Sequence, residues 1–345
     1  MPPSETRRRF LQCSAAAVSS ALIPSFVPPF LPGGSAAASE RGAEPTRSFR
    51  LEENCATFAL PQLQKEFKVV FLADTHLFMD DERGLPFREF SARMAGAYHQ
   101  NRHWKGDRVV TPGEAFEETL ELARAEGAEL IALGGDIFSF PSEAAIDWAL
   151  ERLETSKIPY AYTSGNHDWH YEGLPGTSRE LRETWTQKRL LPLYRGRDPM
   201  NFAVELHGVK MLFIDDSIYE ILPTQLDFLR RELSSGAPTL LFMHIPPYAP
   251  GRGVSYGVGH PDWNADHDPH WKIERRPQWP TEGHSLTTMD FYREITSAPN
   301  LLGILCGHIH RQTLDMLNAR PSLVVGSNAS GASITIRFTK NLEAK

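Results

Sequence analysis

The stretch KVVFLADTH, residues 68–76, decides the fold, because an apolar run typical of a buried strand ends directly in Asp74 and His76. The same order of apolar run and polar side chains recurs four times farther along the chain. The later stretches are Gly135-Asp136, Gly165-Asn166-His167-Asp168, Met243-His244 and Gly307-His308-Ile309-His310. Since the carboxyl ends of neighbouring strands can meet at one edge of a sheet, we expect these polar side chains to converge there.

The converging residues are of the types that bind metals. Asp, His and Asn supply the oxygen and imidazole donors that hold divalent and transition metals. Asp74 and His76 are two residues apart, so in an extended chain they point to one side, as do His308 and His310. Asp136 has two carboxylate oxygens and can bridge two cations. Two metals about 3.5–4 Å apart activate water and clamp a phosphoryl group, so the five stretches predict a two-metal hydrolase.

Each stretch by itself is weak evidence. A lone Asp-x-His or Gly-Asp arises by chance, whereas Gly-Asn-His-Asp and Gly-His-x-His are more specific. His244 alone is more often a packed or surface histidine than a ligand. Asp215-Asp216 also ends a strand, yet we expect it to support a turn or a ligand rather than to bind metal. The prediction of a metal site therefore rests on all five stretches occurring in order at predicted strand ends.

Alternating strands and helices surround these stretches. Strands are predicted over 68–73, 128–133, 158–163, 239–243 and 301–305, with a hairpin over 202–214 and two strand-like runs within 322–338. Helices are predicted over about 112–127, 142–156, 178–191 and 224–233. Thr111-Pro112-Gly113-Glu114 indicates a capping box with proline at the first helical position. The predicted fold class is α/β (α+β), a four-layer sandwich with two mixed β-sheets packed face to face and flanked by α-helices.

Two long segments, residues 77–110 and 247–285, are predicted loop insertions that follow ligand positions. Such irregular segments are usually functional or disordered, and the three Trp residues of the second argue against disorder there. The basic and aromatic residues of the first segment allow two interpretations. They contact a leaving group, or they form an ordinary solvated surface. They are Arg83, Arg88, Arg93, His99, Arg102, His103 and Trp104. The second segment contains His260, His267, His270 and His284. These histidines either form an extra metal site or, as is more common, pack against other residues or face the solvent.

The composition excludes some classes of function. The chain has 345 residues, 41% of them hydrophobic, and a formal charge of −7. That hydrophobic content supports a sizeable core. The acidic balance argues against a non-specific nucleic-acid binder, so no nucleic-acid scaffold role is expected. No uninterrupted apolar run is long enough to predict a transmembrane helix.

The first 38 residues have the order of an export signal. Thr6-Arg7-Arg8-Arg9-Phe10-Leu11-Gln12 resembles the twin-arginine motif, an apolar segment follows, and Ala36-Ala37-Ala38 is a small-residue cleavage site. The alternative is a disordered basic tail. The signal predicts a bacterial protein that the twin-arginine export machinery delivers to the periplasm or outside the cell. Residues 39–66 would then be a lead-in segment and residues 67–345 the domain.

Cysteine use is sparse, because only Cys55 and Cys306 remain after the predicted signal. Cys306 lies in a predicted core strand, where a buried free thiol is the common state. A disulfide between the two is the alternative in an oxidising compartment.

In order and in residue type, the five stretches resemble the calcineurin-like metallophosphoesterase superfamily. Its pattern is Asp-x-His, Gly-Asp, Gly-Asn-His-Asp/Glu, His and Gly-His-x-His, and the resemblance spans residues 68–310. It implies a two-sheet β-sandwich flanked by helices and two bound metal ions, of which Fe, Mn and Zn all suit the donors. It implies that one ion is held by Asp74, His76, Asp136 and His310, and the other by Asp136, Asn166, His244 and His308.

The same resemblance assigns catalytic roles. His167 is similar to the family's non-ligand histidine, which contacts the scissile phosphate and protonates the leaving group, and Asp168 would orient its ring. Asn166 and His167 would both contact the substrate. Purple acid phosphatases have Tyr three residues after the bridging Asp, where this chain has Ser139, which argues against the tyrosinate–iron subgroup.

We therefore predict a metal-dependent hydrolase of phosphoric ester bonds, which cleaves mono- or diesters by attack of a metal-bridging hydroxide. The predicted substrate is a small molecule or a lipid head group that carries the ester. The alternative is a catalytically silent binding or scaffold protein on the same fold. Intact His167 and the full ligand set disfavour that alternative.

Overall fold

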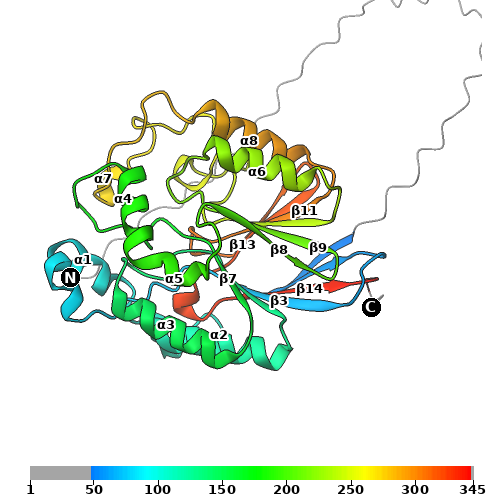
Figure 1. The fold of residues 1–345 in the computed structure, drawn as a ribbon, viewed down its shortest axis with the longest axis horizontal. Helices are drawn as coiled ribbons and strands as arrows, with labels where there is room; N and C mark the ends of the chain where they lie inside the picture. The colour runs from blue at the N-terminus through cyan, green and yellow to red at the C-terminus, as the bar shows by residue number, and fades with distance from the viewer. Residues whose placement is uncertain (1–47, 343–345) are drawn as a thin grey trace, which may run out of the picture. The chain divides into compact units, whose positions relative to one another are not determined.

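The structure is a computed structural model that describes residues 48–342. The predicted export signal, residues 1–38, lies outside the described residues. Two six-stranded sheets form the centre of the described part (Figure 1). The first sheet has the strand order β1-β2-β14-β3-β6-β7, and the second has the order β12-β13-β11-β10-β9-β8. Both combine parallel and antiparallel pairs, which confirms the prediction of two mixed sheets.

The first sheet is built around three buried parallel strands. Its strands are β1 (Ser48–Glu52), β2 (Cys55–Ala59), β3 (Phe67–Leu72), β6 (Leu130–Leu133), β7 (Tyr160–Tyr162) and β14 (Ile334–Thr339). β3, β6 and β7 run parallel, whereas β14 is antiparallel to β3. Both faces of β3 are covered, which is why its sequence is a continuous apolar run instead of an alternating one. The parallel direction brings the carboxyl ends of three strands to one edge.

The second sheet repeats this arrangement. Its strands are β8 (Asn201–Leu206), β9 (Val209–Ile214), β10 (Thr239–Phe242), β11 (Leu301–Cys306), β12 (Thr313–Leu317) and β13 (Arg320–Val324). β9, β10, β11 and β13 are parallel. β8 and β9 form the predicted hairpin, and both residues of its turn, His207 and Gly208, have positive φ.

Helices lie outside both sheets. They are α2 (Pro112–Glu126), α3 (Glu143–Ser156), α4 (Ser178–Trp185), α5 (Leu191–Tyr194), α6 (Pro223–Leu233) and α8 (Leu286–Ser297). The predicted capping box at α2 is confirmed, because Thr111 Oγ1 accepts from Glu114 N and Glu114 Oε2 accepts from Thr111 N. Gly127 ends α2 with a left-handed φ of 64°, a conformation that costs glycine little.

Two hydrophobic cores separate the layers. Alternate residues of the second sheet face different cores, since Phe213 and Phe242 pack with the first sheet while Leu212 and Leu241 pack with α6 and α8. Across the inner core, the rings of Phe71 and Phe242 have centroids 5.5 Å apart. Figure 1 shows α2 and α3 on the outer side of the first sheet and α6 and α8 on the outer side of the second. This arrangement confirms the predicted fold class of two sheets flanked by helices.

The first insertion, residues 77–110, has regular pieces. It contains a 3₁₀ helix, η1 (Glu82–Phe87), the helix α1 (Arg88–Ala97) and a small ribbon of β4 (Asn101–Arg102) with β5 (Val109–Val110). The sequence did not predict these elements. Its basic residues are largely engaged in ion pairs, such as Arg83 with Asp81 and Arg93 with Glu172.

The second insertion, residues 247–285, is ordered around a buried carboxylate. Besides η3 (Val254–Tyr256) and α7 (His270–Ile273), it has no regular element. Asp268 accepts hydrogen bonds from the indole N–H groups of Trp263 and Trp279, at 3.1 and 3.0 Å, and from the Ser255 hydroxyl at 2.6 Å. A fully buried carboxylate needs such donors, and here they tie three parts of the segment together. The tryptophans therefore hold the insertion in a defined conformation, as predicted.

Some elements differ from the predictions. The predicted helix 178–191 is divided into α4, a π-turn η2 (Thr186–Leu190) and α5. β1 and β2 precede the predicted domain start at residue 67, yet they belong to the first sheet, where β1 pairs with β2 and β2 pairs with β14. β12 and α8 were not predicted. η4 (Asn328–Ser330) lies between the two predicted strand-like runs, which are β13 and β14. Cys55 and Cys306 are free thiols. No helix between residues 48 and 342 is long and apolar enough to cross a membrane.

Candidate metal centre

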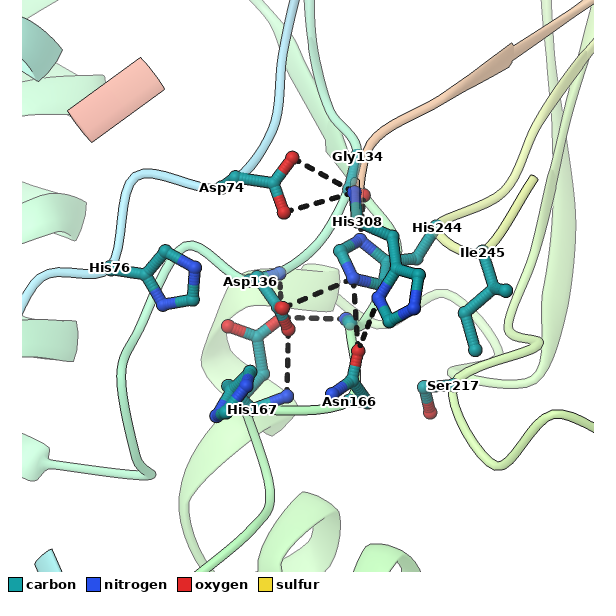
Figure 2. A network of polar contacts seen from close by, with 12 residues as sticks. Asp74, His76, Gly134, Asp136, Asn166, His167, Ser217, His244, Ile245 and His308 are labelled. Carbon is teal, nitrogen blue, oxygen red and sulfur yellow. Dashed lines mark hydrogen bonds and ion pairs between the residues drawn. The ribbon is translucent and has the colours of Figure 1, made fainter. Parts of the chain in front are cut away.

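Loops from both sheets bring the seven predicted metal ligands together. Figure 2 shows all of them except His310. The loops that follow β3, β6 and β7 come from the first sheet, and those that follow β10 and β11 come from the second. The residues are Asp74, His76, Asp136, Asn166, His244, His308 and His310. All seven follow the carboxyl ends of parallel strands, so the topology places them at a common edge.

The donor atoms fall into two groups. Asp74, His76 and His310 form the first, and Asp136, His244 and His308 form the second, with the ligand atoms of each group within 4.8 Å of one another. The family resemblance implied this division, including the separation of His308 from His310.

The donor atoms face one another as metal ligands do. The Nε2 atoms of His76 and His310 are 3.1 Å apart, and His310 Nε2 is 3.4 Å from Asp74 Oδ1. In the second group, His244 Nε2 is 3.1 Å from Asp136 Oδ2. Two imidazole nitrogens at this distance can share only one proton, whereas one cation can accept the lone pairs of both. The residues present therefore fit bound metal ions, and the mixed oxygen and nitrogen donors suit Fe, Mn and Zn.

Asn166 completes the second group. Its Oδ1 atom lies 3.2 Å from His244 Nε2 and 3.0 Å from His308 Nδ1. The opposite end of the amide, Nδ2, is 3.5 Å from a carboxylate oxygen of Glu274 in the second insertion. Because a carboxylate only accepts hydrogen bonds, Glu274 favours the amide orientation in which oxygen faces the metal group.

The carboxylates and imidazoles of the centre shift one another's pKa. Burial disfavours a charged His244 ring, but the Asp136 carboxylate outweighs burial and raises the pKa of His244 to about 10. Burial likewise favours a neutral Asp74, but His310 holds the pKa of that carboxyl below its usual value. Burial and the neighbouring His310 lower the pKa of His76. The two buried carboxylates thus need nearby positive charge, which is the condition that a cation site meets.

Five of the seven predicted ligands have a backbone conformation that is rare outside glycine. Their φ angles lie between 50° and 75°; the residues are Asp74, His76, Asp136, His308 and His310. Such angles cost free energy and cluster at functional sites, where the surrounding structure enforces them. The prediction that Asp74 and His76 converge because the chain is extended is therefore wrong in its reason. The two side chains reach one group through left-handed turns.

Close packing of the loops enforces these turns. Asp74 N donates to Gly135 O and His76 N donates to Asp136 O, both at 3.0 Å, so the loops after β3 and β6 hold each other. Gly135 has a φ of 88°, and a Cβ atom there would lie 2.5 Å from Gly165 N. A side chain at position 135 would therefore push the loops apart.

Asp168 does not have the predicted role. Its carboxylate accepts hydrogen bonds from the backbone N–H groups of Asp136, Phe138 and Gly165, at 2.7–2.9 Å, and not from the His167 ring. The turns after β6 and β7 both leave backbone N–H groups without a backbone partner. The Asp168 carboxylate lies between the two turns and accepts hydrogen bonds from these groups. Burial and the nearby Asp136 raise the pKa of Asp168 to about 7. Asp168 is thus a residue that positions Asp136 and the Asn166 loop.

His167 lines a cavity beside the metal ligands. Its backbone N donates to Asp136 Oδ1 at 2.7 Å, which fixes the residue next to the centre. Its buried Nδ1 atom has no hydrogen-bond partner in the described part of the chain. Burial and the neighbouring Arg276 lower the pKa of the ring well below its usual value. A neutral imidazole keeps one N–H, so His167 can still donate a hydrogen bond.

Two further residues support the histidine ligands. Asp216 Oδ1 accepts from the backbone N–H groups of His244 and Ile245, at 3.0 and 3.1 Å, which is the supporting role predicted for this strand end. The Tyr219 hydroxyl lies 3.1 Å from His308 Nε2 and fixes that ring so that Nδ1 faces Asn166. Partners of this kind on the remote nitrogen are common at metal-binding histidines.

The cavity has a volume of about 220 Å³, and both insertions contribute to its wall. Its lining consists of Tyr98, Asp136, His167, Tyr256, His270, Glu274, His308, Ile309 and His310. The ring of Tyr98 stacks on His76 with centroids 4.1 Å apart, and burial raises the pKa of its hydroxyl to about 12. Tyr98, Tyr256 and Glu274 were not predicted as site residues, because no local motif marks them.

The other insertion residues that the sequence singled out lie elsewhere. None of the seven basic and aromatic residues named in the first insertion lines the cavity. Of the four histidines in the second insertion only His270 does, and none of the four belongs to a metal-ligand group within residues 48–342.

Comparisons with known proteins give one family and one fold. The sequence pattern of the calcineurin-like phosphoesterase family matches residues 67–312. No curated protein sequence matches that of this chain. Among solved structures, a dimetal phosphatase from Danio rerio is similar with a TM-score of 0.50 and 12% identity, over 80% of this chain and 93% of that chain. A purple acid phosphatase from yellow lupin has a TM-score of 0.46 and 13% identity, over 83% of this chain and 56% of that one. At these identities the likeness concerns the fold alone.

Proposed function

Because this chain belongs to the calcineurin-like phosphoesterase family, we propose that it hydrolyses phosphate mono- or diesters at a centre of two metal ions. The observation that carries the proposal is the pair of donor groups beside a cavity at one edge of the two sheets. Each group combines carboxylate and imidazole donors. The similar protein from Danio rerio is a dimetal phosphatase, which agrees with this assignment.

The ligands divide between the two ions in the proposed centre. Asp74, His76 and His310 would hold one, and Asp136, His244, His308 and Asn166 the other. As the family resemblance implies, Asp136 would contact both. The ions would be Fe, Mn or Zn. When bound, two such cations supply a nucleophile at neutral pH and offset the charge of the phosphoryl oxygens.

Side chains of the protein itself would position the substrate. His167 lines the cavity, and its ring would donate a hydrogen bond or a proton to an oxygen of the phosphate ester, most usefully the leaving oxygen. Tyr98 and Tyr256 contribute aromatic rings to the lining of the cavity. Asp168 keeps the Asp136 and Asn166 loops in register, so that the donor groups hold their geometry.

Turnover of phosphate esters tests the proposal. Protein supplied with Mn²⁺ is expected to hydrolyse p-nitrophenyl phosphate, bis-p-nitrophenyl phosphate or both, and a chelator is expected to remove that activity. Release of nitrophenolate measures the rate. A protein that holds its metals and hydrolyses neither ester would instead be a binding protein on the same fold.

We also propose that the N-terminal signal directs export by the twin-arginine route. The proposal rests on the order of charged, apolar and small-residue regions in residues 1–38. Replacing both Arg7 and Arg8 with Lys is expected to leave the precursor in the cytoplasm, which fractionation with an antibody would detect. Normal appearance of the double-Lys variant in the periplasm would contradict the proposal. Replacing both Arg41 and Arg47 with Lys, beyond the predicted cleavage site, is the matched control.

A further inference from the structure

The second insertion places a carboxylate in the wall of the cavity. Glu274 follows α7 and lines the cavity together with His270 and Tyr256 of the same insertion. Arg276 forms an ion pair with Glu274 through Nε, and the Arg276 side chain is 1% exposed. The same guanidinium donates from Nη2 to Asn166 O at 2.9 Å. Arg276 thus ties the insertion to the metal-ligand loop and holds Glu274 in an ionised form at the cavity.

Acidic side chains of the protein line the cavity. No lysine or arginine side chain in the cavity lining balances their negative charge. Among the described residues, none of those lining the cavity is Lys or Arg, whereas both Asp136 and Glu274 are acidic. Asp136 belongs to the proposed metal ligands, but Glu274 is in neither metal group. Arg276 is buried behind Glu274, with donors engaged by Glu274 and by the Asn166 backbone. A substrate therefore meets the carboxylate and not the guanidinium.

A phosphate monoester and a diester differ in the charge that they bring to this wall. A monoester has two ionisable oxygens and is largely dianionic above pH 7, because its second pKa is near 6. A diester has one ionisable oxygen and stays a monoanion. The repulsion by Glu274 is therefore roughly twice as large for the monoester.

The remaining wall suits the second organic group of a diester. Tyr98, Tyr256 and Ile309 line the cavity with aromatic and aliphatic surface. Tyr256 is 38% exposed, so this surface continues to the outside of the protein. A second ester group can lie on such a surface, whereas the second negative charge of a monoester would meet no cationic side chain there.

We infer that Glu274 determines specificity in this centre, and that it favours monoanionic phosphodiesters over dianionic monoesters. The inference rests on the proposed phosphoesterase function. It assigns Glu274 a role toward the substrate charge, in addition to its contact with the Asn166 amide.

Two esters with the same leaving group test the inference. Methyl p-nitrophenyl phosphate is a diester and p-nitrophenyl phosphate a monoester, so the ratio of their kcat/KM values at pH 8 reports on the added charge. Glu274→Gln keeps the shape and removes the charge. We expect it to lower the diester-to-monoester ratio about tenfold, chiefly through a gain for the monoester, as the loss of one nearby unit charge implies. Glu282→Gln is the matched control, because Glu282 is exposed on the same insertion and does not line the cavity. A ratio that changes less than twofold in Glu274→Gln would overturn the inference.

Binding to the wild-type protein gives a readout without turnover and without a variant. Calorimetry with the metal-loaded protein at pH 8 would compare methyl phosphate, a dianion, with dimethyl phosphate, a monoanion. We expect dimethyl phosphate to bind at least as tightly as methyl phosphate. Binding of methyl phosphate that is tighter by tenfold or more would overturn the inference. Because this experiment uses the wild-type protein, its outcome does not depend on the metal content of the Glu274→Gln variant. Absence of hydrolysis of both esters by the metal-loaded wild type would instead count against the proposed function.

Discussion

Replacing Asp136 with Asn is expected to abolish phosphate-ester hydrolysis and to weaken both metal positions. Asp136 Oδ2 is 3.1 Å from His244 Nε2, and its Oδ1 accepts from His167 N. In the proposed centre this carboxylate contacts both ions. An amide keeps one acceptor oxygen, loses the negative charge and cannot bridge two cations through two oxygens. Charge stabilisation by the metals is worth several kcal/mol, so a rate loss of about 10³-fold or more is expected.

Metal content and hydrolysis rate, measured together, check the Asp136 prediction. Asp227→Asn is the matched control, since Asp227 is exposed on α6 and outside the centre. Thermal unfolding of both variants would show that the fold is kept. An Asp136→Asn protein that retains two metals and a tenth or more of the wild-type rate would contradict the assignment of Asp136.

Replacing His167 with Ala is expected to keep both metals and to lower the rate by about 10²–10⁴-fold. The His167 ring belongs to neither donor group, and its buried Nδ1 has no partner in the described part of the chain. The ring is thus available to the substrate. If it serves the leaving oxygen, the loss is small for nitrophenolate, which leaves readily without a proton, and large for an alkyl ester.

The comparison of leaving groups separates two roles of His167. An equal loss for nitrophenyl and alkyl esters would indicate that the ring binds the phosphoryl oxygens instead of the leaving oxygen. Loss of metal in the variant would show that His167 is a ligand and that the division of the centre is mistaken. His267→Ala is the control, because His267 is exposed and does not line the cavity.

The strands and the ligand loops could be predicted because their signals are local. The apolar run at 68–73, the capping box at Thr111 and the hairpin turn at His207-Gly208 each fix structure over a few residues. The topology then brings the ends of such strands to one edge, and left-handed turns aim the side chains at one another. All five local stretches lie within residues 67–312, which the family pattern matches.

The cavity wall could not be predicted because it depends on distant contacts. Glu274 lies at the centre because two sets of contacts hold the irregular insertion in place. Trp263 and Trp279 donate to Asp268 within the insertion. Arg276 binds the Asn166 loop. The role of Asp168 was misjudged for a related reason. Its partners are backbone N–H groups, some of them 30 residues or more away, which no residue spacing reveals.

Counting the metal ions that accompany activity tests the proposed two-metal centre most directly. The chelated protein would be titrated with Mn²⁺, with bound metal determined by elemental analysis and the rate of ester hydrolysis determined on the same samples. We expect about two ions per chain at full activity and no hydrolysis by the chelated protein. Full hydrolysis by protein that contains no bound metal, or a maximal rate with one ion per chain and no second binding event, would contradict the two-metal centre.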